Sequence, residues 1–234
     1  ILFIMRIAKY LANAGLCSRR DAEKLIVQKK VFINKICCEH PSAKVGKGDE
    51  ISVNNKIIEL NTKIRLWKMY KPTKVICTNN DPQKRKTIFS LIPKNLPRMI
   101  CIGRLDYMSE GLILLTNSGD LARKYELPSS KIIRIYRVCI RGKINLEDIT
   151  AINKGIIINK IKYKKVNLKV EKYKSPYTWL IFKMTEGKNR EIRNICEYFL
   201  WDIVNLIRIQ YGSIKLIKQR IGEIKEVKNF KSYL

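Results

Sequence analysis

The sequence has few residues that could bind a metal ion, build a disulfide scaffold or cross a membrane. His40 is the only histidine, and the seven cysteines include no Cys-x-x-Cys pair. Ligands at usable spacing are too few for structural zinc, and the cysteine spacing is not that of a disulfide framework. We therefore expect no metal, reduced cysteines and a cytoplasmic location. No apolar run approaches the roughly 18 residues of a spanning helix, so no membrane association is expected.

Acidic residues are also scarce. The chain has 20 Asp and Glu against 48 Lys and Arg, a net charge of +28, and such a surface favours nucleic acid as a partner. Part of the excess is a bias toward lysine and isoleucine, with 33 Lys, 15 Arg and 37 Ile, as an AT-rich genome would produce. The arginines are the better indicators of binding, because a planar guanidinium makes paired contacts with phosphate or carboxylate.

The chain divides into a small unit at residues 1–60, a linker at 61–63 and a larger unit at 64–234. Its 234 residues, 46% of them hydrophobic, are enough for one large and one small domain with real cores. We see no internal repeat, no low-complexity segment and no glycine-rich nucleotide-binding loop.

Basic side chains gather on two predicted helices of the first unit. Apolar spacing predicts helices over 7–14 and 18–26, with Ser18 as the N-cap of the second helix and Asp21 three residues later. Short strands are expected at 31–33, 36–38 and 51–53. The basic cluster is typical either of a solvated surface or of a phosphate-binding one, and charge alone leaves both interpretations open. Its candidate nucleic-acid contacts are Arg6, Lys9, Ser18, Arg19, Arg20 and Lys24.

The second unit is predicted to be α+β, with more strand than helix, on a mixed and mainly antiparallel sheet. A helix is expected over 189–199. The expected strands are 66–71, 112–115, 132–140, 163–170, 178–184, 204–209 and 214–217.

Three segments of this unit carry chemistry when taken together. Residues 103–106 read Gly-Arg-Leu-Asp and lead, past Glu110-Gly111, into the buried strand. A carboxylate beside an arginine on such a loop is how a fold holds a reactive acid in place. The other two segments are Arg134-Ile135-Tyr136-Arg137-Val138 and the stretch 186–194. Each alone has an ordinary explanation: a surface ion pair, a half-exposed strand, or a turn before a basic helix.

Both units resemble known families. Residues 14–22, followed by Val31-Phe32-Ile33-Asn34, resemble the RNA-binding domain named after ribosomal protein S-four, with Lys35 where that family usually has glycine. The three segments of the second unit, in this order, resemble bacterial ribosomal RNA pseudouridine synthases of the RsuA/RluB type. Further stretches that fit this family are Lys71-Pro72, Glu126-Leu127-Pro128 and residues 206–212.

This resemblance implies isomerisation of a uridine within ribosomal RNA, with no cofactor and no metal. Asp106 matches the catalytic aspartate, which would act as nucleophile at the anomeric carbon or as base at the 2′ position. Tyr136 matches the active-site tyrosine, and Arg193 matches the arginine that pairs with the carboxylate. Arg104 is expected to hold the loop or to fill the space that the displaced base leaves.

The same resemblance gives the expected partner, ribosomal RNA or a ribosomal subunit precursor, bound by a monomer. Lys188, Asn189 and Arg190 are expected to hold the RNA backbone at the edge of the site. The 126–128 and 187–193 stretches look more like the large-subunit enzymes. A small-subunit enzyme and a catalytically inert assembly factor are the alternatives.

RNA binding is predicted to weaken steeply as salt rises, because lysines and arginines that neutralise phosphates displace condensed counterions. Between about 50 and about 200 mM salt, affinity for a ribosomal RNA fragment should fall by about 10³-fold or more if six or more phosphates are contacted. A flat salt profile would show that the positive charge is not used on RNA.

Overall fold

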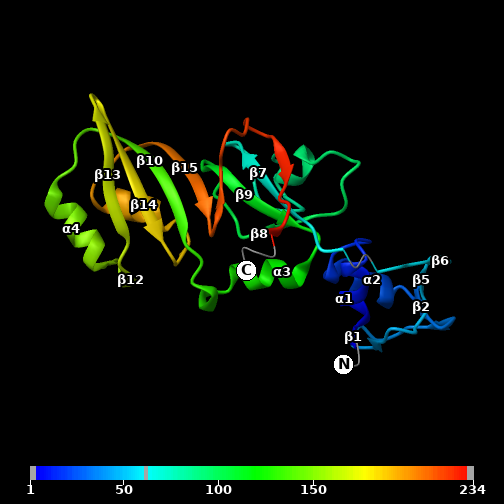
Figure 1. The fold of residues 1–234 in the computed structure, drawn as a ribbon. Helices are drawn as coiled ribbons and strands as arrows, with labels where there is room; N and C mark the ends of the chain where they lie inside the picture. Colours follow the sequence, from blue (N-terminus) through cyan, green and yellow to red (C-terminus); the bar gives the residue numbers. More distant parts are fainter. Residues whose placement is uncertain (1–3, 61–62, 231–234) are drawn as a thin grey trace. The chain divides into compact units, whose positions relative to one another are not determined.

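The computed structural model describes residues 4–60 and 63–230, which form two compact units with separate buried cores (Figure 1). The first unit contains residues 4–60 and 63–65 together with two later segments, Lys94–Ile100 and Thr116–Gly119. The second contains the other described residues. Residues 61 and 62 of the predicted linker lie outside the described residues.

The first unit packs two short helices against a four-stranded antiparallel sheet of order β3-β2-β5-β6. Ile7, Leu11 and Ile26 are fully buried, as the helical spacing predicts. Ser18 caps the second helix, because its hydroxyl accepts a hydrogen bond from the Asp21 backbone N–H at 3.1 Å. The elements are β1 (Met5–Arg6), α1 (Ile7–Asn13), α2 (Arg19–Val27), β2 (Val31–Ile33), β3 (Ile36–Cys37), β4 (Lys44–Val45), β5 (Ile51–Val53) and β6 (Lys56–Ile57).

Two-residue turns close both hairpins of this sheet. Asn34 and Lys35 join β2 to β3 with φ of 51° and 67°, and Asn54 and Asn55 join β5 to β6 with φ of 49° and 63°. Positive φ at both central residues is the geometry that matches the twist of paired strands. Asparagine tolerates it, whereas the Lys35 side chain is strained there.

The second unit is built on a nine-stranded sheet whose main path runs β13-β14-β10-β15-β9-β7-β17. Strands β15 and β9 are parallel, whereas β10 is antiparallel to both β14 and β15. The predicted α+β class with a mixed, mainly antiparallel sheet is confirmed. The strands are β7 (Leu66–Lys71), β8 (Ile100–Ile102), β9 (Glu110–Thr116), β10 (Arg134–Arg141), β13 (Asn167–Lys174), β14 (Tyr177–Met184), β15 (Ile203–Tyr211), β16 (Ile214–Lys215) and β17 (Ile224–Glu226).

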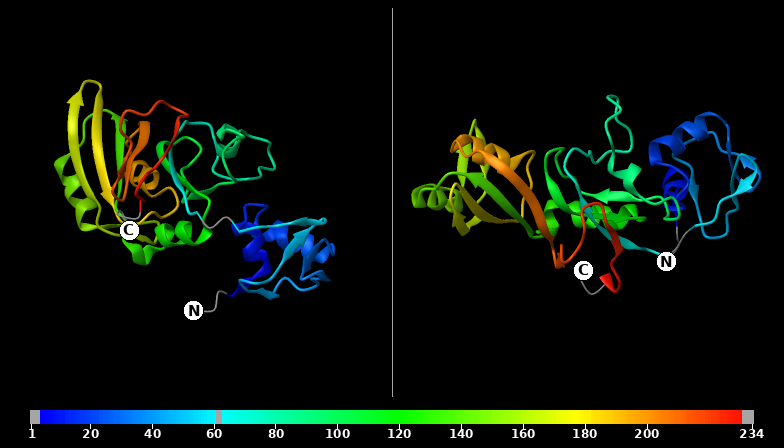
Figure 2. Two further views of the ribbon diagram at one scale, coloured as in Figure 1. Left: turned by 45° about the vertical axis from the view of Figure 1, so that its right-hand side comes forward. Right: turned by 90° about the horizontal axis from the view of Figure 1, so that it is seen from above.

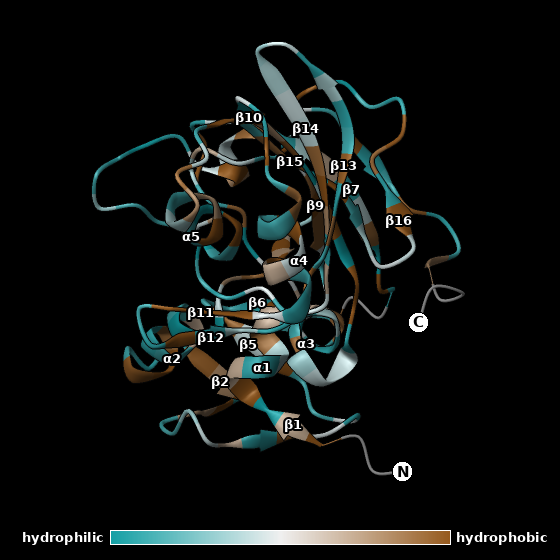
Figure 3. Cartoon of the chain, turned by 90° about the vertical axis from the view of Figure 1, so that its left-hand side faces the viewer, coloured by the Kyte–Doolittle hydropathy of each residue, from teal (hydrophilic) through white to brown (hydrophobic). Residues whose placement is uncertain are grey.

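Two helices cover one face of the β13-β14-β10 part of this sheet. Ile152 of α4 (Leu146–Lys154) and Ile195 of α5 (Glu191–Tyr198) belong to one buried cluster with Val138 of β10 and Phe182 of β14. The hydrophobic residues of β14 and β15 appear brown in Figure 3, against mostly teal loops. Because side chains alternate along a strand, Tyr136 lies on the same face as Val138 and therefore on the side of α5.

The structure corrects the strand that we predicted over 163–170. The chain leaves the strand after Tyr163, the end of a separate hairpin of β11 (Ile156–Ile158) and β12 (Ile161–Tyr163), and β13 begins only at residue 167. The Asn153 side chain takes over the backbone groups of Leu168, donating to its carbonyl at 3.1 Å and accepting from its N–H at 2.7 Å. Leu168 still pairs with Phe182 of β14, so the Asn153 contact lies on the outer edge of β13. The ladder stops before Asn167, where the Val166 N–H donates to the Ile152 carbonyl of α4 at 3.4 Å and not to a strand.

Several elements were not predicted at all. They are α3 (Gly119–Glu126), α4, β1, β4, β6, β8, β11, β17 and the short 3₁₀ turns Ile88–Leu91 and Pro128–Ser130. The segment that leads from β7 to the first of these turns projects as a long loop (Figure 2). Helix α5 is also shorter than predicted, because Arg190 at its N-cap has a left-handed conformation with φ of 51°.

Replacing Lys35 by glycine is expected to stabilise the first unit by about 0.5–1 kcal/mol, because glycine removes the left-handed strain at a smaller entropic cost. Native-state hydrogen exchange of the β2 and β5 amides measures this change. Lys35→Ala is the matched control, since alanine removes the same charged side chain and keeps the strain. Equal stabilities for the two variants would contradict the explanation.

Candidate active site

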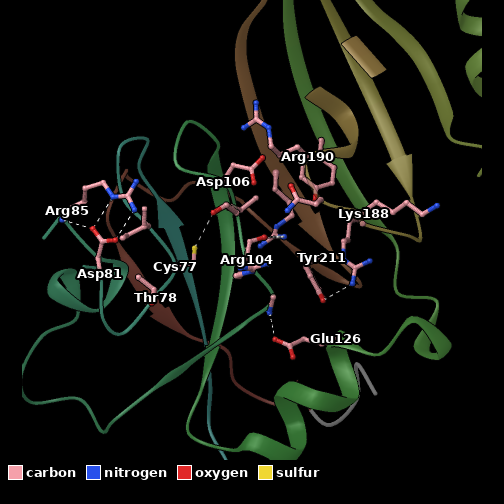
Figure 4. Close-up of a pocket in the computed structure, with 18 of the residues that line it drawn as sticks. Cys77, Thr78, Asp81, Arg85, Arg104, Asp106, Glu126, Lys188, Arg190 and Tyr211 are labelled. Atoms are coloured by element: carbon pink, nitrogen blue, oxygen red, sulfur yellow. Dashed lines mark hydrogen bonds and ion pairs between the residues drawn. The ribbon is translucent and has the colours of Figure 1, made fainter. Parts of the chain in front are cut away.

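A cleft of about 740 Å³ opens in the second unit. One wall is the loop 76–85, the opposite wall is the 187–190 segment, and the residues Gly103–Asp106 lie between them. Figure 4 shows Asp81 and Arg85 on the first wall, Lys188 and Arg190 on the second, and Asp106 in the middle. The volume is within the range of pockets that hold a nucleotide-sized ligand.

The Asp106 carboxylate is open to the cleft, whereas its cationic partner is enclosed. Arg193 Nε lies 3.7 Å from Asp106 Oδ2, and the exposed fractions of the two side chains are 15% and 38%. Burial lowers the pKa of Arg193, and the Asp106 charge acts in the opposite direction. Within residues 4–60 and 63–230, the Asp106 carboxylate accepts no hydrogen bond, and Arg193 Nε is buried without one. The Asp106 carboxylate, which faces the cleft, therefore keeps its hydrogen-bonding capacity for a ligand.

A smaller hollow of about 100 Å³ brings the three predicted catalytic residues together. Asp106, Tyr136 and Arg193 all line it, although they come from a loop, from β10 and from α5. Tyr136 is half-buried and packs against the core cluster beneath the sheet. The β10–β15 register shifts next to Tyr136, a local irregularity that re-aims side chains and is frequent beside active sites.

A buried lysine anchors the loop that carries Asp106. Lys71, the last residue of β7, is 0% exposed. Its ammonium donates to the backbone carbonyls of Pro72 at 2.9 Å, Asp106 at 3.2 Å and Ser109 at 2.8 Å. Burial lowers the pKa of Lys71, and the three carbonyls compensate for lost hydration. Ser109 also accepts a hydrogen bond from Arg193 Nη2 at 3.1 Å, so Lys71 and Arg193 meet at one residue.

A second buried cation supports the same loop from β15. Arg208 is 2% exposed and donates to the carbonyls of Leu112 at 2.7 Å and Arg104 at 3.5 Å. It reaches them because β9 and β15 approach closely at Gly111, where a Cβ atom would lie 2.4 Å from the Arg208 carbonyl oxygen. Gly111 also has φ of 101°, so only glycine fits this position.

The predicted RNA contacts of this unit line the cleft: Arg104, Lys188, Asn189 and Arg190. The 188–190 turn is fixed at the start of α5, because the Lys188 N–H donates to the Glu191 carboxylate at 2.7 Å. The Lys188 ammonium also bonds the Lys162 carbonyl and lies over the Tyr163 ring. Lys188 is therefore held in place before any ligand binds.

The site residues predicted from the sequence do not include the loop on the opposite wall. Arg85 makes a paired contact with Asp81 at 2.8 and 2.9 Å, and lies over the Tyr107 ring. Hydrogen bonds from Arg85 lower the pKa of Asp81 to about 2. The four-residue spacing between Asp81 and Arg85 was the sequence feature that could have predicted this ion pair. Cys77 also lines this wall.

The basic candidates of the first unit are considered separately. Arg6 and Arg19 line a shallow hollow of about 560 Å³ on that unit. Arg20 and Lys24 are exposed on α2, and Lys24 lies 3.7 Å from Asp21. The Ser18 hydroxyl is used at the helix end, where it donates to the Asp21 carboxylate at 2.6 Å. Lys9 lies half-buried on α1.

In the part of the chain that the structure describes, no three or more His, Cys, Asp or Glu side chains are grouped to hold a metal ion. No helix among the same residues has the length and apolar character needed to cross a membrane.

Comparison with known proteins decides the family. The model described as RNA pseudouridylate synthase matches residues 65–198, and the S4 domain model matches residues 5–51. This chain belongs to the RNA pseudouridylate synthase family. The resemblance stated from the sequence is thereby confirmed, as is the prediction that the chain is a pseudouridine synthase, an isomerase with an RNA-binding S4 domain.

Relatives match this pseudouridine synthase over nearly its whole length. A Rickettsia felis protein named "uncharacterized RNA pseudouridine synthase" is 45% identical over 97% of this chain and 98% of its own. A Buchnera aphidicola protein named "ribosomal large subunit pseudouridine synthase B" is 37% identical over 91% of this chain and 86% of its own. A solved pseudouridylate synthase structure shares the fold, with a TM-score of 0.69, 24% identity and 97% coverage of both chains.

Removing the buried ammonium by Lys71→Met is expected to lower the free energy of unfolding of the second unit by about 2–4 kcal/mol, because three buried carbonyls lose their donor. It should also reduce activity by releasing the Asp106 loop. Urea unfolding and product formation are the two measurements.

Lys68→Met is the matched control for this change. Lys68 lies on the same strand, and its ammonium donates to the Lys215 carbonyl at 3.1 Å in an exposed position, so its replacement should cost less than about 1 kcal/mol. If Lys71→Met proves as stable and as active as Lys68→Met, Lys71 does not anchor the loop.

Proposed function

We propose that this protein converts a specific uridine to pseudouridine in large-subunit ribosomal RNA. The observation that carries the proposal is the hollow in which the open Asp106 carboxylate faces the enclosed Arg193 guanidinium beside the Tyr136 ring. The large-subunit target is supported by the names of relatives such as the Buchnera aphidicola protein. No observation on the site favours the small-subunit alternative.

The reaction breaks the bond between N1 of uracil and C1′ of ribose, rotates the base, and forms a bond from C5 to C1′. The hydrogen on C5 leaves as a proton, and N1 gains one, so no oxidant or energy source is needed. In this proposal the Asp106 carboxylate acts on the ribose, as nucleophile at C1′ or as base at the 2′ position. Because no group in the described residues donates a hydrogen bond to this carboxylate, its oxygens are available for either role.

Arg193, whose Nε lies 3.7 Å from Asp106 Oδ2, balances the charge of the carboxylate when RNA covers the site and removes water. Tyr136 stacks its ring on the uracil, and its hydroxyl assists the proton transfer from C5. Arg104 holds the loop or fills the space of the extruded base. Extrusion costs a few kcal/mol and is least costly in loops of folded RNA.

We further propose that both units hold the RNA. Lys188, Asn189 and Arg190 would contact the backbone beside the extruded nucleotide. The first unit, with the proposed boundary at residue 60, would bind a separate RNA segment through Arg6, Lys9, Ser18, Arg19, Arg20 and Lys24. We also propose that the protein acts as a monomer and that its partner is ribosomal RNA or a ribosomal subunit precursor. It would act in the cytoplasm, where such RNA is assembled.

One substitution distinguishes the proposed enzyme from the alternative, a catalytically inert RNA-binding factor. Asp106→Asn should abolish pseudouridine formation, by at least about 10³-fold, while RNA affinity stays nearly unchanged. The measurements are pseudouridine content of treated ribosomal RNA and a binding titration.

Asp202→Asn is the matched control. Asp202 lies 3.7 Å from Arg141 in another Asp–Arg pair, but that pair is on the surface, so the variant should keep full activity. Full activity in Asp106→Asn would remove the enzymatic role of Asp106.

A further inference from the structure

The large cleft extends well beyond the hollow around Asp106. Glu126, Arg134 and Tyr211 line the large cleft but not the small hollow. Figure 4 shows Glu126 and Tyr211 on the far side of Arg104 from Asp106. If the small hollow receives the target uridine, as the proposed function requires, this remaining space faces a neighbouring nucleotide of the same strand.

Glu126 is unusual among the acids of the cleft. Asp81 is paired with Arg85, and Asp106 faces Arg193. In the described ranges, Glu126 has no cation within 4.0 Å, and its one hydrogen bond comes from the Gly103 N–H to Oε1 at 2.6 Å. An unneutralised carboxylate repels phosphate, so it does not serve to bind an RNA backbone. It suits the N–H groups of a base.

A fixed guanidinium lies at the same end of the cleft. Arg134 donates to the Thr185 carbonyl at 3.1 Å and to the Tyr211 hydroxyl at 3.2 Å, and it stacks on the Tyr211 ring. The Tyr211 hydroxyl in turn donates at 2.9 Å to the carbonyl of Tyr125, the residue before Glu126. These contacts fix the guanidinium, and the Gly103 N–H separately orients the Glu126 carboxylate. Holding both groups in advance reduces the entropic cost of binding a base.

Guanine matches this pair of groups. Its adjacent N1–H and N2–H donors can bond the two oxygens of one carboxylate, while its O6 and N7 accept from a guanidinium. Adenine and cytosine each offer a single amino group, and uracil offers none. We propose that Glu126 and Arg134 form a subsite that reads a guanine base close to the target uridine.

Glu126 also supports the turn before Asp106 through the Gly103 N–H, so a truncation would disturb the loop. Glu126→Gln separates the two roles. The amide keeps one oxygen that can accept from Gly103, but it replaces the second acceptor with a donor that opposes the guanine N–H groups. A purely structural role would tolerate this change.

The test is a binding selection that needs no catalysis. A hairpin RNA library with one loop uridine and two randomised nucleotides on each side is bound to the wild-type protein, to Glu126→Gln and to Glu147→Gln. Glu147 is an exposed acid of α4 outside the cleft, so its variant controls for lost charge. Wild type and Glu147→Gln should enrich guanine about 10-fold or more at one fixed position, and Glu126→Gln should lose that enrichment.

A second comparison uses the best RNA of the selection with inosine in place of the enriched guanine. Inosine lacks only the N2 amino group, so wild type should bind it about 5- to 10-fold more weakly, and Glu126→Gln should bind both RNAs equally. No guanine enrichment by wild type, or equal enrichment by Glu126→Gln, would overturn the subsite. Absence of pseudouridine in the wild-type-treated library would instead count against the proposed function and leave the base preference standing.

Discussion

The ammonium group of Lys71 is the contact on which the rest of the site depends. It lies fully buried at the end of β7 and binds three backbone carbonyls, including those of Asp106 and Ser109. Ser109 also receives Arg193 from α5. A buried ammonium is costly unless its hydrogen bonds are satisfied. The Asp106 loop therefore has to keep the conformation that places its carbonyls within reach of Lys71. Arg208 adds a second support from β15.

This arrangement separates Asp106, the proposed catalytic acid, from the groups that support its loop. Asp106 is more than twice as exposed as Arg193, and the supporting Lys71 and Arg208 are shielded from solvent. Rigid, enclosed cations around an accessible carboxylate are what preorganised catalysis requires, since little has to move when substrate binds. Under the proposed function, the basic residues of the cleft walls and of the first unit would contact the RNA backbone and not the reacting atoms.

The sequence predicted the α+β class, most strands, and the residues that meet in the small hollow. Asp106, Tyr136 and Arg193 come from three separate segments, and only the family resemblance linked them, since spacing alone does not bring residues 87 positions apart into contact. Lys71 was visible only as part of a Lys-Pro pair, because nothing local reveals that a lysine is buried. The role of Gly111 depends on its close approach to Arg208 of β15, and that of Glu126 on its hydrogen bond from Gly103. No local sequence pattern identifies either partner. The strand over 163–170 was wrongly extended because the hydrogen bond from the Val166 N–H to Ile152 of α4 is tertiary.

Mapping pseudouridines at single-nucleotide resolution tests the central claim most directly. Ribosomal RNA from cells that contain this protein would be compared with RNA from cells that lack it and from cells in which it is restored. The account predicts that one pseudouridine, in a loop or junction of the large-subunit RNA, disappears without the protein and returns with it. Identical maps in all three, or a change confined to the small-subunit RNA, would contradict it.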